Sequence, residues 1–412
     1  MMQLNAGFPA LQDDTAGHRK LRDALAHTTD RADIGFVRHV RGPGAATTAK
    51  TTARLFAHKT HLVHVGIGGS ALGPEMLLSA LGVANGKRVQ FLNNIDPDAL
   101  ARQIREWRVG ETFFYVVSKS GTTAETMAAL AIITGWLESQ GVASAQWKEH
   151  IVLCTDPQKG DLRTLAREHH LSCLEVPAAV GGRFSVLTDV GLFPAAWAGV
   201  DVDRLLTGAQ EMAAAAHAAD EDANPVTRTA LWLEARRKEG ATLTVFMPYS
   251  SLLKDFTAWW VQLWAESLGK EGKGLTPVMA YGATDQHSQM QLFMQGPRDK
   301  ALLMLDVAGH GRDFELRSSL ATPSAQALAP FRLGELMQAE FAGTLKALEG
   351  EKRPYLHLTV GQVDAASVGA LVMYFECLTV AMGHLLGVDP FNQPGVEAGK
   401  KYANDWLASH RR

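Results

Sequence analysis

The chain has few cysteines and no strong excess of charge of either sign. Only three of its 412 residues are cysteines, and Cys154, Cys173 and Cys377 each lie in an apolar stretch. An odd number of widely spaced cysteines argues against a disulfide framework and predicts buried thiols in a reducing compartment. The formal net charge of -3 gives no large basic surface, so neither nucleic acid nor an anionic membrane is supported as a partner. We expect a small ligand.

Targeting, metal-binding and membrane signals are also missing. Residues 1–14 contain no basic region followed by an apolar core, so we predict no signal peptide and a cytoplasmic location. No His-Glu-x-x-His or paired-cysteine spacing occurs, and we predict no metal site. Residues 368–388 are apolar enough to imitate a membrane span. Because Glu376 lies in the middle and no basic residues flank the stretch, we predict a buried core helix instead.

Short β-rich runs alternate with longer helical runs along most of the chain, after a mixed, polar stretch at residues 4–53. We expect strands at 62–65, 89–92, 112–117 and 150–154, with helices at 74–81, 97–106 and 123–139. The order starts again after residue 224, with helices at 225–238, 252–268 and 286–294 and strands at 242–247 and 276–280. This alternation predicts the α/β class, with two copies of one parallel-sheet unit. Turns 69–70 and 250–251 should be equivalent, as should turns 120–123 and 284.

The turn after residues 112–117 is the most informative segment. It leads directly into a helix and reads Ser118, Lys119, Ser120, Gly121, Thr122, Thr123. Hydroxyls and free N–H groups at the positive end of a helix dipole favour a bound phosphate. The competing interpretation is a capping box made by Thr122 and Glu125, but capping needs only one of these four hydroxyls. We therefore predict an anion site.

A glycine-rich turn follows the strand that ends at residue 65. Gly66, Gly68 and Ala71 fit the G-x-G-x-x-G/A pattern of dinucleotide sites. A dehydrogenase, however, needs an acidic residue at the tip of the next strand, where this chain has Asn93 and Asn94. Glycines that let the backbone approach a phosphate suit a sugar phosphate equally well, so the nicotinamide alternative is disfavoured.

Two further segments carry side chains suited to proton transfer. Gly181 and Gly182 allow Arg183 to be aimed inward, where it would stabilise an oxyanion, although a surface arginine is an equal alternative at this point. Gln262 and Glu266 lie four residues apart, on one side of a mostly apolar helix. Glu266 is therefore a candidate general base, unless it merely begins an exposed tail.

Taken together, these segments resemble the glucose-6-phosphate isomerase family. Residues 181–191 resemble one family signature and residues 391–400 resemble the second, and the order of motifs follows the family from about residue 60 to 400. The resemblance implies two flavodoxin-like SIS (sugar isomerase) domains at residues 59–205 and 206–390. An N-terminal helical arm at 1–58 and a C-terminal helix at 391–412 would complete the chain.

The resemblance also implies an activity and roles for particular residues. The family interconverts glucose 6-phosphate and fructose 6-phosphate, in glycolysis and gluconeogenesis, through a cis-enediol and without cofactor or metal. Glu266 would be the base, Arg183 would stabilise the enediolate, and His287 and Lys400 would open the sugar ring. The substrate would be bound by Gly69, Ser70, Ser118, Lys119, Ser120, Thr123, Gly182, Gln262 and Gln393. His287 would come from the partner subunit, which implies a homodimer.

Two alternatives keep the fold but change the function. A looser pocket beside Gln262 would also admit mannose 6-phosphate. A SIS module that only senses a phosphosugar would lack a base, so Glu266, His287 and Lys400 together disfavour it.

Overall fold

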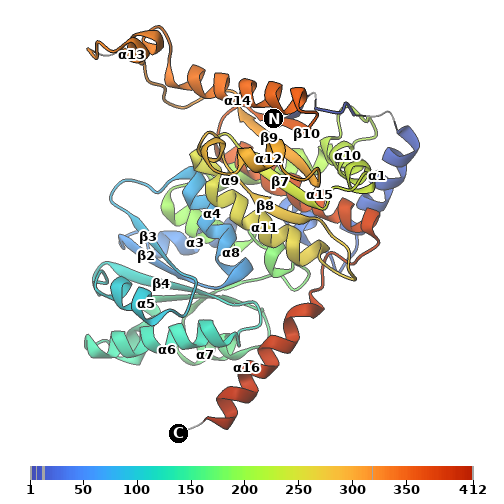
Figure 1. Cartoon of the computed structure of the whole chain (residues 1–412). Coiled ribbons are helices and arrows are strands. Elements are labelled where there is room, and N and C mark those ends of the chain that lie inside the picture. Colours follow the sequence, from blue (N-terminus) through green and yellow to red (C-terminus); the bar gives the residue numbers. More distant parts are fainter. Residues whose placement is uncertain (1, 6, 12–13, 318, 411–412) are drawn as a thin grey trace.

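The computed structural model describes residues 2–5, 7–11, 14–317 and 319–410. Two five-stranded sheets, each flanked by helices, form the body of the protein (Figure 1). The first sheet contains β2 (His61–Val65), β3 (Arg88–Leu92), β4 (Thr112–Val117), β5 (Ile151–Thr155) and β6 (Ser172–Glu175). The second contains β1 (Gln3–Leu4), β7 (Leu243–Pro248), β8 (Thr276–Met279), β9 (Lys300–Val307) and β10 (Tyr355–Val360).

The strand orders show that the two sheets are copies of one unit. The first sheet runs β3-β2-β4-β5-β6 with every pair parallel, which is the flavodoxin-like order 2-1-3-4-5. In the second sheet β8-β7-β9-β10 repeats the first four places in parallel, and β1 pairs antiparallel with β10 in the fifth. The predicted α/β class with two flavodoxin-like units is confirmed.

Helices connect and cover the strands. The N-terminal helices are α1 (Thr15–Thr29) and α2 (Phe36–Arg41), and the next helices along the chain are α3 (Thr47–Leu55), α4 (Leu72–Leu81), α5 (Pro97–Ile104), α6 (Ala124–Ser139), α7 (Asp161–Glu168) and α8 (Asp189–Ala198). Later in the chain come α9 (Val202–Ala215), α10 (Pro225–Lys238), α11 (Lys254–Leu268), α12 (Met290–Gln295), α13 (Pro323–Leu328), α14 (Leu333–Gly350), α15 (Ala365–Leu386) and α16 (Glu397–Ser409). The N-terminal helices α1 and α2 pack against α15, α10 and α9 of the second half. The predicted domain limit between residues 205 and 206 falls inside α9, which continues across it.

Two expectations about the arrangement need correction. The turn at Thr284 follows β8, so its counterpart is the turn after β3 and not the turn at residues 120–123 after β4. The error arose because β9, which is the true counterpart of β4, was not predicted from the sequence. The N-terminal arm is also not purely helical, because Gln3 and Leu4 pair with Thr359 and Leu358 of the second sheet.

The core explains why these segments form their elements. β2, β4 and β5 are buried at every residue, as expected for parallel strands covered on both faces. α15 is the one described helix long and apolar enough to cross a membrane, and 83% of its most apolar window is buried inside the protein, as predicted for a core helix. Cys154 and Cys377 are buried free thiols and Cys173 is a half-buried one.

Candidate active site

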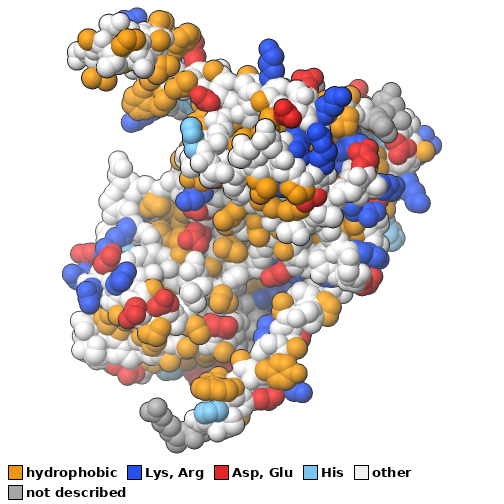
Figure 2. Space-filling model, in the orientation of Figure 1, with side chains coloured by type: hydrophobic (Ala, Val, Ile, Leu, Met, Phe, Trp, Pro, Cys, Tyr) orange, Lys and Arg blue, Asp and Glu red, His pale blue; other side chains and the backbone are white. Residues whose placement is uncertain are grey.

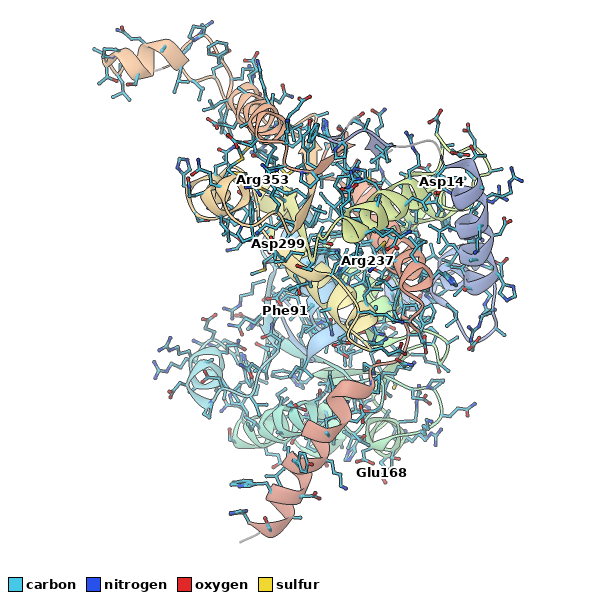
Figure 3. The ribbon with its side chains drawn as sticks, turned by 45° about the vertical axis from the view of Figure 1, so that its right-hand side comes forward. Asp14, Phe91, Glu168, Arg237, Asp299 and Arg353 are labelled. Carbon is cyan, nitrogen blue, oxygen red and sulfur yellow. The ribbon has the colours of Figure 1, made fainter. Side chains whose placement is uncertain are left out.

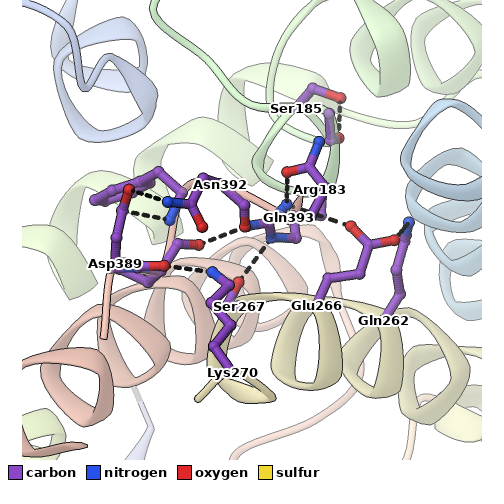
Figure 4. Close-up of polar contacts among 12 residues, drawn as sticks. Arg183, Ser185, Gln262, Glu266, Ser267, Lys270, Asp389, Asn392 and Gln393 are labelled. Carbon is purple, nitrogen blue, oxygen red and sulfur yellow. Dashed lines mark hydrogen bonds and ion pairs between the residues drawn. The ribbon is translucent and has the colours of Figure 1, made fainter. Parts of the chain in front are cut away.

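Arg183 is the centre of a buried polar cluster between the two sheets. It lies on the short turn η3 (Gly182–Phe184), and its side chain is only 3% exposed. Its guanidinium donates hydrogen bonds to Ser267 Oγ (2.7 Å), Glu266 Oε2 (3.3 Å), Gln393 Oε1 (2.9 Å), Pro390 O (2.6 Å) and Asn392 O (3.0 Å), as Figure 4 shows for this cluster. Arg183 is therefore aimed inward, and the surface alternative is wrong.

Glu266 is held by two donors and stays open to solvent on one side. Its Oε1 accepts from Gln262 Nε2 at 3.0 Å and its Oε2 pairs with Arg183 Nη1 at 3.3 Å. Because Gln262 lies one helical turn earlier on α11, the two side chains share a face, as the spacing predicted. The Glu266 side chain is 34% exposed. A ligand can therefore reach a carboxylate whose orientation is already set.

Two glycine-rich turns approach each other closely at this cluster because Gly69 carries no side chain. A Cβ on Gly69, in the turn η1 (Gly68–Ser70), would lie 2.5 Å from both the carbonyl carbon and oxygen of Gly182. Gly68 has a φ of +55°, and a Cβ on it would lie 2.9 Å from Gln262 Nε2. The turn after β2 is thus packed against the turn that carries Arg183.

The hydroxyl turn lies at the carboxyl end of β4, next to β2 in the sheet. The Ser118 and Thr123 hydroxyl oxygens are 2.8 Å apart, and Ser120 Oγ lies 3.3 Å from Thr123 Oγ1. Thr123 is the N-cap residue of α6, but its side chain binds no N–H group of the helix. The Thr122 hydroxyl donates to Ser120 Oγ at 3.3 Å and caps no N–H group of α6 either. The alternative capping box of Thr122 and Glu125 is therefore wrong, and no described side chain caps the start of α6. This geometry suits an anion.

Lys119 lies in the hydroxyl turn but its ammonium points elsewhere. Its Nζ donates to the carbonyl oxygens of Ala178 (2.9 Å) and Val180 (2.8 Å). Burial lowers the pKa of Lys119, while Asp156 opposes that effect. Lys119 therefore ties the hydroxyl turn to the loop that precedes Gly181.

The single chain does not bring His287 and Lys400 into the cluster. Both side chains are exposed, and Lys400 Nζ pairs with Glu397 Oε1 at 2.9 Å within α16. α16 projects from the body of the protein, as Figures 1 and 3 show. Within the described part of the chain, no hydrogen bond or ion pair joins either residue to Glu266 or Arg183.

The structure adds site residues that sequence reasoning missed. Ser267 accepts from Arg183, and the carbonyl oxygens of Pro390 and Asn392 accept from the same guanidinium. Adjacency to Glu266 was a weak signal for Ser267. Backbone carbonyls carry no side-chain signal, so only the fold could reveal them. In the described ranges, no group of three His, Cys, Asp or Glu residues is arranged to hold a metal ion.

Comparison with known proteins first defines the class. The fold is that of phosphosugar isomerases. Tagatose-6-phosphate ketose/aldose isomerase from Escherichia coli superposes with a TM-score of 0.54 at 12% identity, covering 92% of this chain and 94% of that one. A likeness at this identity concerns the fold alone.

Sequence similarity then identifies the family: the chain belongs to the phosphoglucose isomerase family, whose profile matches residues 46–411. The glucose-6-phosphate isomerase of Rubrobacter xylanophilus is 38% identical over 97% of this chain and 90% of its own length. That of Thermus thermophilus is 40% identical over 84% of this chain and 83% of its own length.

Solved structures agree with this assignment. A hypothetical protein from Thermus thermophilus has a TM-score of 0.94 at 34% identity and covers 99% of this chain and 100% of its own. A glucose-6-phosphate isomerase from Chlamydia trachomatis has a TM-score of 0.80 at 26% identity, covering 94% of this chain and 78% of that one. The resemblance stated from the motifs is confirmed.

Proposed function

We propose that this chain is an aldose–ketose isomerase that interconverts glucose 6-phosphate and fructose 6-phosphate. Family membership over residues 46–411 supports the reaction. The single structural observation that carries the proposal is the pairing of the half-open Glu266 carboxylate with the buried Arg183 guanidinium at 3.3 Å. A base and an oxyanion stabiliser side by side are what proton transfer next to a carbonyl requires.

In the proposed mechanism the phosphate is bound by the hydroxyl turn and the sugar extends toward α11. Glu266 removes the proton from C2 and returns it to C1, and the same groups run the reverse reaction. Arg183 stabilises the enediolate oxygen through Nη1, while Gln262 keeps the Glu266 carboxylate oriented. His287 and Lys400 open the sugar ring before proton transfer.

The remaining site residues have supporting roles in this proposal. Ser70, Ser118, Ser120 and Thr123 bind the phosphate, with backbone N–H groups of the turn at Lys119. Gly69 and Gly182 let the backbone approach the ligand, and Gln393 orients sugar hydroxyls.

We extend the proposal to a homodimer in the cytoplasm that acts in glycolysis and gluconeogenesis. His287 is exposed in the single chain, so it is free to complete the site of a partner subunit. The three free cysteines support this location, because disulfides are rare in a reducing compartment.

A direct assay tests the reaction. Purified protein supplied with glucose 6-phosphate in the presence of EDTA should form fructose 6-phosphate, because the proposed chemistry uses only side chains. Absence of turnover, with and without added divalent ions, would refute the proposed reaction.

Replacing Glu266 tests the base. Glu266→Gln keeps the side-chain volume and a hydrogen-bond acceptor toward Arg183 but removes the proton acceptor, so kcat should fall about 100-fold or more. The dissociation constant for fructose 6-phosphate, measured by calorimetry, should stay within about threefold because the phosphate contacts are elsewhere. Glu271→Gln is the control, since Glu271 is 67% exposed just beyond α11 and should leave kcat unchanged. Wild-type turnover by Glu266→Gln would remove Glu266 from the role of base.

A further inference from the structure

His64 is a buried histidine that the proposed mechanism does not use. It lies in β2 with no exposed surface, and its Nε2 is 2.7 Å from the carbonyl oxygen of Ser70. The imidazole packs between two aromatic rings, with centroids 5.1 Å from both Phe91 and Tyr115. Phe91 is labelled in Figure 3. The ring is thus fixed on both sides, beneath the glycine turn η1.

The protonation state of His64 follows from its surroundings. Burial lowers the pKa of His64 to about 4, so the ring is neutral at neutral pH. A carbonyl oxygen only accepts hydrogen bonds, and the single ring proton therefore lies on Nε2 and is donated to Ser70. Nδ1 is buried and has no partner in the described ranges. The hydrogen bond to Ser70 is the one polar contact that this ring makes there.

The carbonyl group that accepts from His64 belongs to η1, the turn that packs against the residues of the active-site cluster. Ser70 ends η1, whose Gly69 packs against the Gly182 carbonyl and whose Gly68 lies against Gln262. The two turns are in close contact here, because a Cβ added on Gly69 would lie only 2.5 Å from the Gly182 carbonyl group. A shift of the Ser70 carbonyl therefore displaces both the turn of Arg183 and the amide that orients Glu266.

We propose that His64 is a positioning residue for the isomerase reaction, which holds η1 in place by donating a hydrogen bond to Ser70 O. The inference rests on the proposed function and deepens it. His64 does not contact the sugar phosphate; it acts through the backbone of the turn. The residue type matters because the site needs a neutral donor of fixed length within an aromatic pocket.

The test compares a variant that loses the donor with one that keeps it. His64→Leu removes the donor, so the KM for fructose 6-phosphate should rise about tenfold as η1 moves, and kcat should fall. His64→Gln places an amide N–H at a similar distance from the backbone and should return KM to within about threefold of wild type. Variants that are merely less stable lower the active fraction and hence the apparent kcat, but they leave KM unchanged.

His61 provides the matched control. It is a second buried histidine on β2, with its pKa likewise lowered by burial to about 4, but it contacts Thr112 (3.1 Å) and not η1. His61→Leu should leave KM unchanged even if it lowers the melting temperature. If His64→Leu fails to fold, His64→Met, which also lacks a donor but is flexible enough to fill the pocket, takes its place.

Several results would overturn the inference. These are an unchanged KM in the donor-free variant, no recovery in His64→Gln, or an equal rise of KM in His61→Leu. These outcomes can be distinguished from a failure of the proposed function itself, because in that case the wild-type protein would show no isomerase turnover at all.

Discussion

Arg183 and Glu376 are both charged residue types buried in this protein, but only Arg183 has partners. Arg183 donates to five acceptors, whereas both carboxyl oxygens of Glu376 are buried in α15 without a hydrogen-bond partner among the described residues. Burial raises the pKa of Glu376 well above its usual range. The carboxyl group is therefore protonated at neutral pH, because an unpaired buried charge would cost several kcal/mol.

The buried, protonated Glu376 predicts a contribution to the pH dependence of stability that the Glu376→Gln variant lacks. Below pH about 4.5 Glu376 is protonated in both states; above it the unfolded chain releases the proton and the folded chain keeps it. Wild-type stability should therefore fall by about 1.4 kcal/mol per pH unit from this group as pH rises, up to its raised folded pKa. Glu376→Gln has no proton to release, so its advantage in urea unfolding should grow between pH 5 and 8.

The comparison isolates one group. Asp189, whose pKa burial raises to about 6, adds a loss of the same sign between about pH 4 and 6 in both proteins, and it cancels in the difference. Glu138→Gln, at an exposed position of α6, should show no growing advantage. A constant difference between Glu376→Gln and wild type at all pH values would contradict the buried, protonated state.

At the scale of elements, the hydroxyl turn leaves the N-terminus of α6 uncapped, which is the arrangement that the proposed phosphate site requires. The three hydroxyls of Ser118, Ser120 and Thr123 contact one another, and none of the described side chains caps the helix. The cost of an uncapped helix start is recovered when an anion accepts from the free N–H groups. Gly121 lies in the middle of the turn with a φ of +69°, a left-handed conformation that favours glycine.

The double substitution Ser120→Ala with Thr123→Ala should separate binding from stability. Loss of two hydroxyl donors should weaken fructose 6-phosphate and inorganic phosphate by about tenfold or more, measured by calorimetry. The melting temperature should change by only a few degrees, since Thr123 makes no capping hydrogen bond. Thr134→Ala removes a hydroxyl elsewhere on α6 and should leave the affinity for both ligands unchanged. Unaltered phosphate affinity in the double variant would show that the anion binds elsewhere.

At the scale of the whole molecule, two segments that expose apolar side chains extend from the body. α16 exposes Tyr402 (71%) and Trp406 (60%), and the arm around α13 exposes Phe314 (63%) and Phe331 (49%). Figure 2 shows apolar side chains on both projections. Exposed apolar clusters of this kind are typical of protein interfaces and support the proposed homodimer.

Subunit complementation tests whether His287 acts in the partner's site. His287→Ala and Glu266→Gln should each be nearly inactive alone. After mixing and refolding together, a heterodimer has one site with both native residues if His287 crosses the interface, so about a quarter of wild-type activity should return. His287→Ala mixed with wild type provides the reference for exchange. No recovery despite exchange would place His287 in its own subunit's site or outside the reaction.

The sequence by itself determined β2 to β5, β7 and β8, several of the main helices and the local shape of each motif. β4 is an unbroken apolar run, α15 is apolar over six turns around one glutamate, and the hydroxyl turn sits where β4 meets α6. These features depend on the period of hydrophobic residues and on turn chemistry, which act between near neighbours. The ordered motifs from about residue 60 to 400, among them residues 181–191 and 391–400, gave the resemblance to the family that the family profile confirms.

Only the tertiary structure decided how these motifs meet. Arg183 binds groups more than 200 residues away at Pro390, Asn392 and Gln393, and Gly69 packs on Gly182. It also decided that β1 completes the second sheet and that Lys119 faces the loop before Gly181. Such contacts depend on packing between distant segments and on backbone carbonyls. Neither leaves a periodic signal in the chain, and so the site's geometry exists only once both sheets have folded together.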